Sequence, residues 1–205
     1  EEKCNLGCCK PCCHEQGIRR SRALRKLLKR YRKRRRIITI LVGLIAHGDL
    51  HTIDRKKLFD WFRKRLDKAG FSGFLVAGGL EVAWQPKLNG WVVHFHLLSL
   101  GARKKHRDAL RASFASSDLK RPFVCQSLRD PRRQISYLLK INTYYRPFAQ
   151  IGQEKGPAYP LPRPQMEELL SWYANFKPSD FLFLYGLRRQ GDRIRPTPKR
   201  RSAKR

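Results

Sequence analysis

The chain has 205 residues, with 46 Lys or Arg against 16 Asp or Glu, and its formal net charge is +30. This charge favours a nucleic acid as partner over an anionic membrane surface, and it argues against metalloenzymes that act on small molecules. No apolar run approaches the roughly 20 residues of a membrane span, so we expect a soluble, cytoplasmic protein without a membrane partner.

Five of the six cysteines lie within the first 13 residues, and a histidine follows them. The spacings Cys4-x3-Cys8 and Cys9-x2-Cys12 are typical of zinc knuckles, in which thiolate and imidazole ligands close a tetrahedral shell. We therefore expect a knuckle over residues 1–18 that holds a structural Zn²⁺; the alternative is a metal-free, disulfide-prone cluster. The candidate zinc ligands are Cys4, Cys8, Cys9, Cys12, Cys13 and His14.

Residues 19–36 form the densest basic run of the chain and contain no acid. Four apolar or aromatic residues from Leu24 to Tyr31 recur at helical spacing, so the run predicts an amphipathic helix with one apolar stripe and basic remaining faces. Basic faces of this kind can contact DNA phosphates. The candidate DNA-binding residues here and in a later helix are Arg19, Arg20, Arg30, Lys33, Arg34, Arg35, Arg36, Arg132 and Arg133.

The central part of the chain predicts the order strand, helix, strand, strand, helix, strand. The expected elements are a strand at Ile37–Val42, a helix capped by Thr52 or Asp54 and ended by Gly70, strands at Phe74–Trp84 and Trp91–Leu100, a helix at Arg103–Phe114 and a strand at Pro122–Gln126. This order is the split ferredoxin-like βαββαβ topology, which RNA-recognition domains share. We therefore expect an α+β fold with a central antiparallel sheet, helices on one face, and extra helices at both ends.

Residues 81–98 predict a hairpin around an asparagine–glycine turn. Because side chains alternate along a strand, His94 and His96 point to the same face. A two-residue turn places Glu81 opposite Leu98, a four-residue turn places it opposite His96, and both keep it on the histidine face. Two imidazoles and one carboxylate form an open metal site, also suited to zinc hydrolases and non-haem iron enzymes; the alternative is a hydrogen-bonded histidine pair.

A further helix is expected to begin at Pro131 and to continue to Tyr145. In such a helix Tyr137, Lys140 and Tyr144 share one face. A tyrosine in this setting is usually a core residue, because a phenol is a poor nucleophile at neutral pH. A phosphodiester whose charge is withdrawn by a metal ion is a target that the phenol of Tyr137 can attack.

The C-terminal part of the chain divides into two expected regions. Residues 151–188 predict a helical segment, with a Gly/Pro-rich loop before a helix at Gln165–Phe176 and a packing stripe at Asp180–Leu187. Residues 189–205 are basic and lack a core pattern, so we expect a disordered tail.

His94-Phe-His96 resembles the HUH motif (histidine, hydrophobic residue, histidine) of the HUH endonuclease superfamily, and Tyr137-Leu-Leu-Lys140 resembles its Tyr-x-x-Lys motif. Within this superfamily the chain is most similar to rolling-circle replication initiators (Rep proteins) of bacterial plasmids, which often begin with a cysteine-rich knuckle. We assign residues 37–150 to an HUH endonuclease core, since the strand that opens this range also resembles the first strand of the superfamily.

The resemblance implies a metal-dependent endonuclease of single-stranded DNA. Tyr137 would attack a phosphodiester and leave a 5′-phosphotyrosine and a free 3′-hydroxyl, and Lys140 would contact the phosphate. Tyr144 is a candidate second nucleophile, because some members of the superfamily use two tyrosines. The implied ligands for Mg²⁺ or Mn²⁺ are Glu81, His94 and His96.

The implied partners are single-stranded DNA at an origin or hairpin, and a host polymerase and helicase, since the chain contains no Gly-x4-Gly-Lys-Ser/Thr loop of its own. The implied location is the bacterial cytoplasm, at the nucleoid or a plasmid. One alternative is an HUH transposase or relaxase, which shares the chemistry. Another is a non-catalytic, zinc-containing nucleic-acid-binding protein, although the strand signature of RNA-recognition domains is absent.

Overall fold

A computed structural model of the chain describes residues 4, 6–32, 34–114, 122–138, 143–145 and 157–198. The first elements are α1 (Lys10–Arg30), β1 (Arg35–Ala46), α2 (Arg55–Lys68), β2 (Leu75–Gln85), β3 (Gly90–Leu100), α3 (Lys104–Ala112) and β4 (Phe123–Ser127). The later elements are α4 (Pro131–Tyr137), β5 (Tyr144–Tyr145), β6 (Tyr159–Pro160), α5 (Arg163–Ala174), β7 (Leu182–Tyr185), β8 (Leu187–Gln190) and β9 (Arg193–Pro196).

Five antiparallel strands form the central sheet in the order β4-β1-β3-β2-β7. The first four follow the predicted βαββαβ order, so the α+β class is confirmed and the histidine strand β3 lies in the middle of the sheet. The fifth strand was not predicted. Residues 182–185, expected in a helical segment, instead pair with Val76–Gly79 at the edge of β2.

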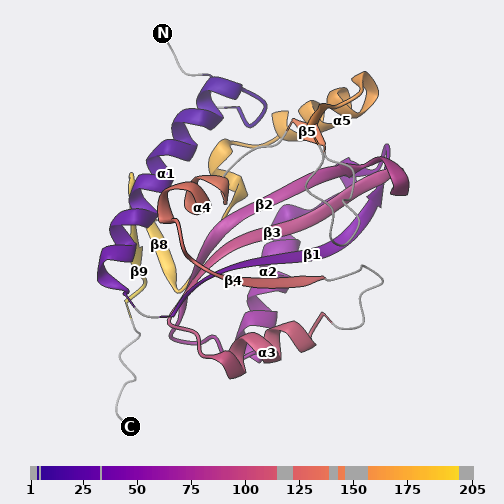
Figure 1. The fold of residues 1–205 in the computed structure, drawn as a ribbon. Coiled ribbons are helices and arrows are strands. Elements are labelled where there is room, and N and C mark those ends of the chain that lie inside the picture. Colours follow the sequence, from indigo (N-terminus) through magenta and orange to yellow (C-terminus); the bar gives the residue numbers. More distant parts are fainter. Residues whose placement is uncertain are drawn as a thin grey trace.

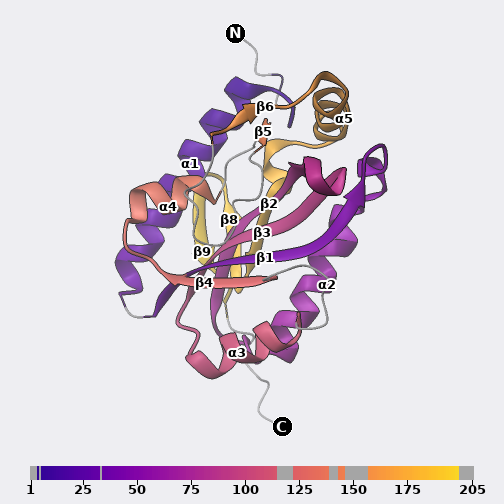
Figure 2. The same cartoon turned by 45° about the vertical axis from the view of Figure 1, so that its right-hand side comes forward.

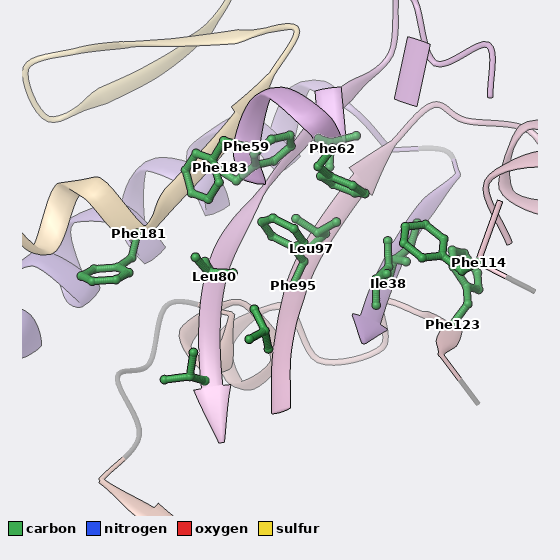
Figure 3. Close-up of a cluster of buried hydrophobic side chains, with 14 of the residues drawn as sticks. Ile38, Phe59, Phe62, Leu80, Phe95, Leu97, Phe114, Phe123, Phe181 and Phe183 are labelled. Atoms are coloured by element: carbon green, nitrogen blue, oxygen red, sulfur yellow. The ribbon is translucent and has the colours of Figure 1, made fainter. Parts of the chain in front are cut away.

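Helices cover both faces of this sheet, which corrects the prediction that they lie on one face. Figures 1 and 2 show α2 and α3 on one side and α1 and α4 on the other. On the first side Phe62 of α2 stacks on Phe95 of β3 with ring centroids 4.6 Å apart, and Phe59 and Phe183 pack around this pair (Figure 3). These rings are buried, so this face of the sheet is a sealed apolar core.

On the second side the predicted apolar stripe of the basic helix is confirmed. Leu24 and Leu27 of α1 are buried in one cluster with Ile135 of α4 and Leu98 of β3. The predicted boundaries of this helix, residues 19 and 36, are wrong at both ends, because α1 begins at Lys10 and ends at Arg30. The knuckle expected over residues 1–18 therefore overlaps the helix, and Arg35 and Arg36 belong to β1.

The hairpin between β2 and β3 has a turn of four residues. A 3₁₀ turn spans Pro86–Leu88, Asn89 is left-handed (φ 43°), and Gly90 already pairs with Gln85. Glu81 therefore lies opposite His94, rather than opposite Leu98 or His96 as the two predicted registers had it. The predicted face is confirmed, because the turn has an even number of residues.

The strands of this hairpin approach closely at Gly78. A Cβ atom at this position would lie 1.9 Å from the carbonyl oxygen of His96, so no other residue fits without separating the two strands. The glycine thereby keeps β2 and the histidine strand at their observed spacing.

The C-terminal region differs from the expected disordered tail. Strands β8 and β9 form a hairpin in which Leu187 and Ile194 are buried in the cluster beneath α1. The residues from 199 onward lie outside the described part of the chain.

Glu168 of α5 fixes the tip of the sheet. Its carboxylate accepts hydrogen bonds from the backbone N–H groups of Gly48 (3.0 Å) and Leu50 (2.9 Å) and from Nε1 of Trp91 (2.8 Å). One side chain thus connects α5 to β3 and to the loop after β1. Among the described residues, no helix has the length and apolar character needed to cross a bilayer.

Candidate functional site

Glu81, His94 and His96 converge on the face of the sheet that α1 and α4 cover. Nε2 of His94 lies 3.4 Å from Oε2 of Glu81, and Nε2 of His96 lies 3.2 Å from the same oxygen. The ligand atoms of all three residues lie within 4.8 Å of one another, and all three side chains are buried. This group can hold a metal ion, as the sequence predicted.

Each imidazole is oriented by a contact through its other nitrogen. Nδ1 of His94 donates to the carbonyl of Val92 at 3.3 Å, and Nδ1 of His96 lies 2.9 Å from Oγ1 of Thr39. An imidazole whose Nδ1 carries the proton presents the lone pair of Nε2 to a cation. Both Nε2 atoms face Glu81, so the donor set fits a divalent cation with open coordination positions.

The charge of Glu81 matches this arrangement. Burial alone would raise the pKa of its carboxyl, but His94 and His96 outweigh that effect and lower the pKa to about 2. The buried carboxylate is therefore an anion that needs a positive partner.

Tyr137 is the last residue of α4 and lies beside the histidines. Its ring makes an edge contact with the ring of His96, with centroids 5.1 Å apart and planes at 66°. Tyr137 is 52% exposed, whereas the three residues of the Glu81 group are buried. Asp130 and Pro131 begin α4 as predicted, and the Asp130 carboxylate accepts a hydrogen bond from the N–H of Arg133 at 3.0 Å.

Comparisons with protein-family models, with curated proteins and with solved structures give no match for this chain. The chemistry of the site therefore follows from its own geometry.

Of the two predicted neighbours of Tyr137, the structure describes only Tyr144. Lys140 lies outside the described residues. Tyr144 belongs to β5, which pairs with β6, so the prediction that it shares a helical face with Tyr137 is wrong. The Asn-Thr pair before Tyr144 favours turns over helix, and the two following tyrosines favour a strand.

The sulfurs of Cys4, Cys9 and Cys12 form a second group that can hold a metal ion. Their Sγ atoms lie within 4.8 Å of one another, and those of Cys4 and Cys12 are 3.7 Å apart. The backbone amide of Cys12 lowers the pKa of the Cys9 thiol, but the thiols of Cys4 and Cys12 together with desolvation outweigh it, and this pKa rises to about 11. A bound cation would offset the repulsion between neighbouring thiolates and so favour the deprotonated form of Cys9.

The other three candidate zinc ligands point elsewhere. Cys13 donates to the carbonyl of Gly7 at 3.1 Å, Cys8 packs against the main apolar core, and His14 is exposed on α1. Because α1 begins at Lys10, successive residues of this run face different directions around the helix.

The predicted DNA-binding residues differ in how far they are exposed. Arg20 is buried and donates to the carbonyl of Pro178 at 2.7 Å, so it anchors α1 to the rest of the protein. Arg19 pairs with Glu15 and Asp192. The exposed members are Arg19, Arg30, Arg34, Arg132 and Arg133, while Arg35 and Arg36 are half-buried and Lys33 lies outside the described residues.

Thr39, which orients His96, was not predicted as a site residue. The signal was present, since Thr39 is the only polar residue within the apolar run Ile37–Val42. A hydroxyl on the buried face of a strand needs a hydrogen-bond partner, and here the partner is an imidazole nitrogen.

Proposed function

We propose that this protein is a metal-dependent nicking enzyme for single-stranded DNA, of the HUH endonuclease type, in which Tyr137 is the nucleophile. The observation that carries the proposal is the contact between the half-exposed ring of Tyr137 and the ring of His96. A phosphate bound at the three converging side chains would lie within reach of that phenol. The net charge of +30 supports a polyanionic substrate.

The proposed reaction is a transesterification. The phenolic oxygen of Tyr137 forms a bond to phosphorus, the bond from phosphorus to the 3′ oxygen breaks, and the proton lost by the phenol ends on that leaving oxygen. The products are a 5′-phosphotyrosine and a free 3′-hydroxyl. One ester replaces another, so the step needs no external energy source and can run in reverse.

Glu81, His94 and His96 would hold a divalent cation, Mg²⁺ or Mn²⁺ in this proposal. When bound, the cation withdraws negative charge from a non-bridging phosphate oxygen. The chain itself holds both Nε2 atoms toward one point through Thr39 and Val92. It also buries the three ligand residues, whereas Tyr137 is 52% exposed.

Initiation of rolling-circle replication is the role that we propose, because a free 3′-hydroxyl is what a polymerase extends. Single-stranded DNA at an origin or hairpin, a host helicase and a polymerase would be the partners, in a bacterial cell. Transposases and relaxases of the same type share this chemistry and differ in the DNA that they act on. A non-catalytic binding protein would not need a phenol against a metal centre.

The decisive experiment is a denaturing gel of labelled single-stranded DNA incubated with protein and Mn²⁺. We expect a covalent protein–DNA band that Tyr137→Phe abolishes, because the phenylalanine keeps the ring contact and lacks the attacking oxygen. Tyr144→Phe is the matched control and should keep the band. EDTA should remove the band from the wild type; a band that persists in EDTA, or in the Tyr137→Phe protein, would exclude the mechanism.

We also propose that Cys4, Cys9 and Cys12 bind a structural Zn²⁺. Two thiolates at 2.3 Å from a tetrahedral zinc lie about 3.8 Å apart, and the observed separation of Cys4 and Cys12 is 3.7 Å. We expect about one zinc per chain by elemental analysis. Cys9→Ser should lose it and Cys13→Ser should retain it; equal zinc contents in the two variants would contradict this assignment.

A further inference from the structure

A groove of about 560 Å³ lies between α1, α4 and α5. Figures 1 and 2 both show α1 and α4 side by side on this face of the sheet. The loop before α1 contributes to its lining through Gly7, and Tyr173 contributes from α5. The volume is in the range of ligand-binding clefts.

The charge lining this groove is of one sign. The described lining residues include no Asp or Glu, and Glu15, the acid within α1, pairs instead with Arg19 outside the groove. Cationic side chains held this close repel one another unless an anion lies between them. The cationic residues that line the groove are Lys10, Arg22, Arg25 and Arg132.

Apolar side chains lie among these cations. Ile18 and Leu170 line the groove and are 39% and 36% exposed. A duplex presents phosphates outward and keeps its bases stacked inside, whereas a single strand offers base faces as well as phosphates. A groove with both kinds of surface is therefore complementary to a single strand.

The groove also lies close to the proposed nucleophile. Ser136 lines it and directly precedes Tyr137, whose ring contacts His96. The groove therefore begins one residue away from the side chain at which the phosphate would react.

We propose that this groove binds the nucleotides of the single strand that flank the cleaved phosphate. Arg22, Arg25 and Arg132 contact the phosphates, and Ile18 and Leu170 contact the bases. The inference rests on the proposed function, because it takes the reacting strand as the occupant. It adds that α1, an element outside the βαββαβ core, supplies part of the substrate site.

The test measures binding in the Tyr137→Phe background, so that no cleavage occurs. The probes are a fluorescein-labelled oligothymidylate and a duplex of equal length, followed by fluorescence anisotropy at several salt concentrations. The double variant Arg22→Glu/Arg25→Glu should bind the single strand at least about tenfold more weakly, and the slope of log affinity against log salt should fall by about 1.4. Leu170→Asp should weaken single-strand binding more than duplex binding.

The matched control is Lys64→Glu/Lys68→Glu, which reverses two exposed charges on α2, on the other side of the sheet. It changes the net charge by the same amount and should lose less than about threefold in affinity. Equal losses in the two double variants would show a general charge effect and overturn the groove. So would wild-type affinity in Arg22→Glu/Arg25→Glu.

The two proposals fail separately in these experiments. If the covalent band forms but the groove variants bind normally, the groove assignment alone is wrong. If the groove variants lose single-strand binding but no band ever forms, the groove stands as a binding site and the nicking chemistry is wrong.

Discussion

The two faces of the central sheet are built from the same strands and have opposite characters. On one face Phe95 of β3 packs under Phe59 and Phe62. The three aromatic rings are in contact and all three residues are buried. On the other face the neighbouring residues of the same strand, His94 and His96, lie beside a half-exposed tyrosine. Strand alternation lets one strand contribute to the core on one face and to the candidate metal site on the other.

The difference separates the residues that hold the fold together from those that form the candidate metal site. The aromatic face holds the strands in register, and the polar face uses that register to bring Glu81 opposite His94. A change on the first face should therefore act on the free energy of unfolding, and a change on the second should act on metal binding or catalysis.

The largest expected effect on folding comes from Phe62→Ala. The ring is fully buried and stacked on Phe95, so its loss leaves a cavity and should lower the free energy of unfolding by about 3–5 kcal/mol. Tyr137→Phe on the opposite face should change it by less than about 0.5 kcal/mol. Urea unfolding of both variants measures this, and similar losses would refute the division between the faces.

A smaller effect is expected from Thr39→Val, which keeps the side-chain shape and removes the hydroxyl beside Nδ1 of His96. Loss of such a partner typically weakens metal affinity by about 10–100-fold. Calorimetric titration with Mn²⁺ measures this change. Thr39→Ser restores the hydroxyl and should recover most of the affinity; if serine binds Mn²⁺ as weakly as valine does, the hydroxyl is not what orients the imidazole.

A further effect, on a different property, concerns the acid stability of the metal-free protein. The pKa of Glu81 falls from its usual value near 4.5 to about 2 on folding, so its contribution to stability is present above pH 4.5 and is lost as the pH falls toward 2. Glu81→Gln has no such group. Its melting temperature should fall less than that of the wild type between pH 5 and pH 2, and parallel curves would contradict the assigned pKa.

The sequence predicted this site to the extent that it depends on alternation. Glu81 is on the histidine face because its parity with His94 survives any turn with an even number of residues. Its partner across the strands was not predictable in the same way, because the turn starts at Pro86 rather than at Asn89. Turn chemistry at one end of a hairpin sets the partner, and two adjacent turn signals competed here.

The remaining errors have local causes. The β8–β9 hairpin was not predicted because most residues of its two strands are arginine or glutamine. Its two buried residues, Leu187 and Ile194, therefore did not stand out as a pattern. Helices cover both faces of the sheet because α1 has an apolar stripe that packs on the second face. The sequence predicted this stripe but did not show which surface it packs against. Periodicity gives the face of an element and leaves its partner open.

Two of the few acids of this chain, Glu81 and Glu168, face inward, where imidazoles, backbone amides and an indole take up their charge. The outer surface is correspondingly poorer in negative groups than the composition suggests. Protein purified from a cell extract at low ionic strength should therefore contain bound nucleic acid from the extract as a contaminant. A wash in concentrated salt should remove this nucleic acid, so that affinities measured afterwards are those of the protein alone.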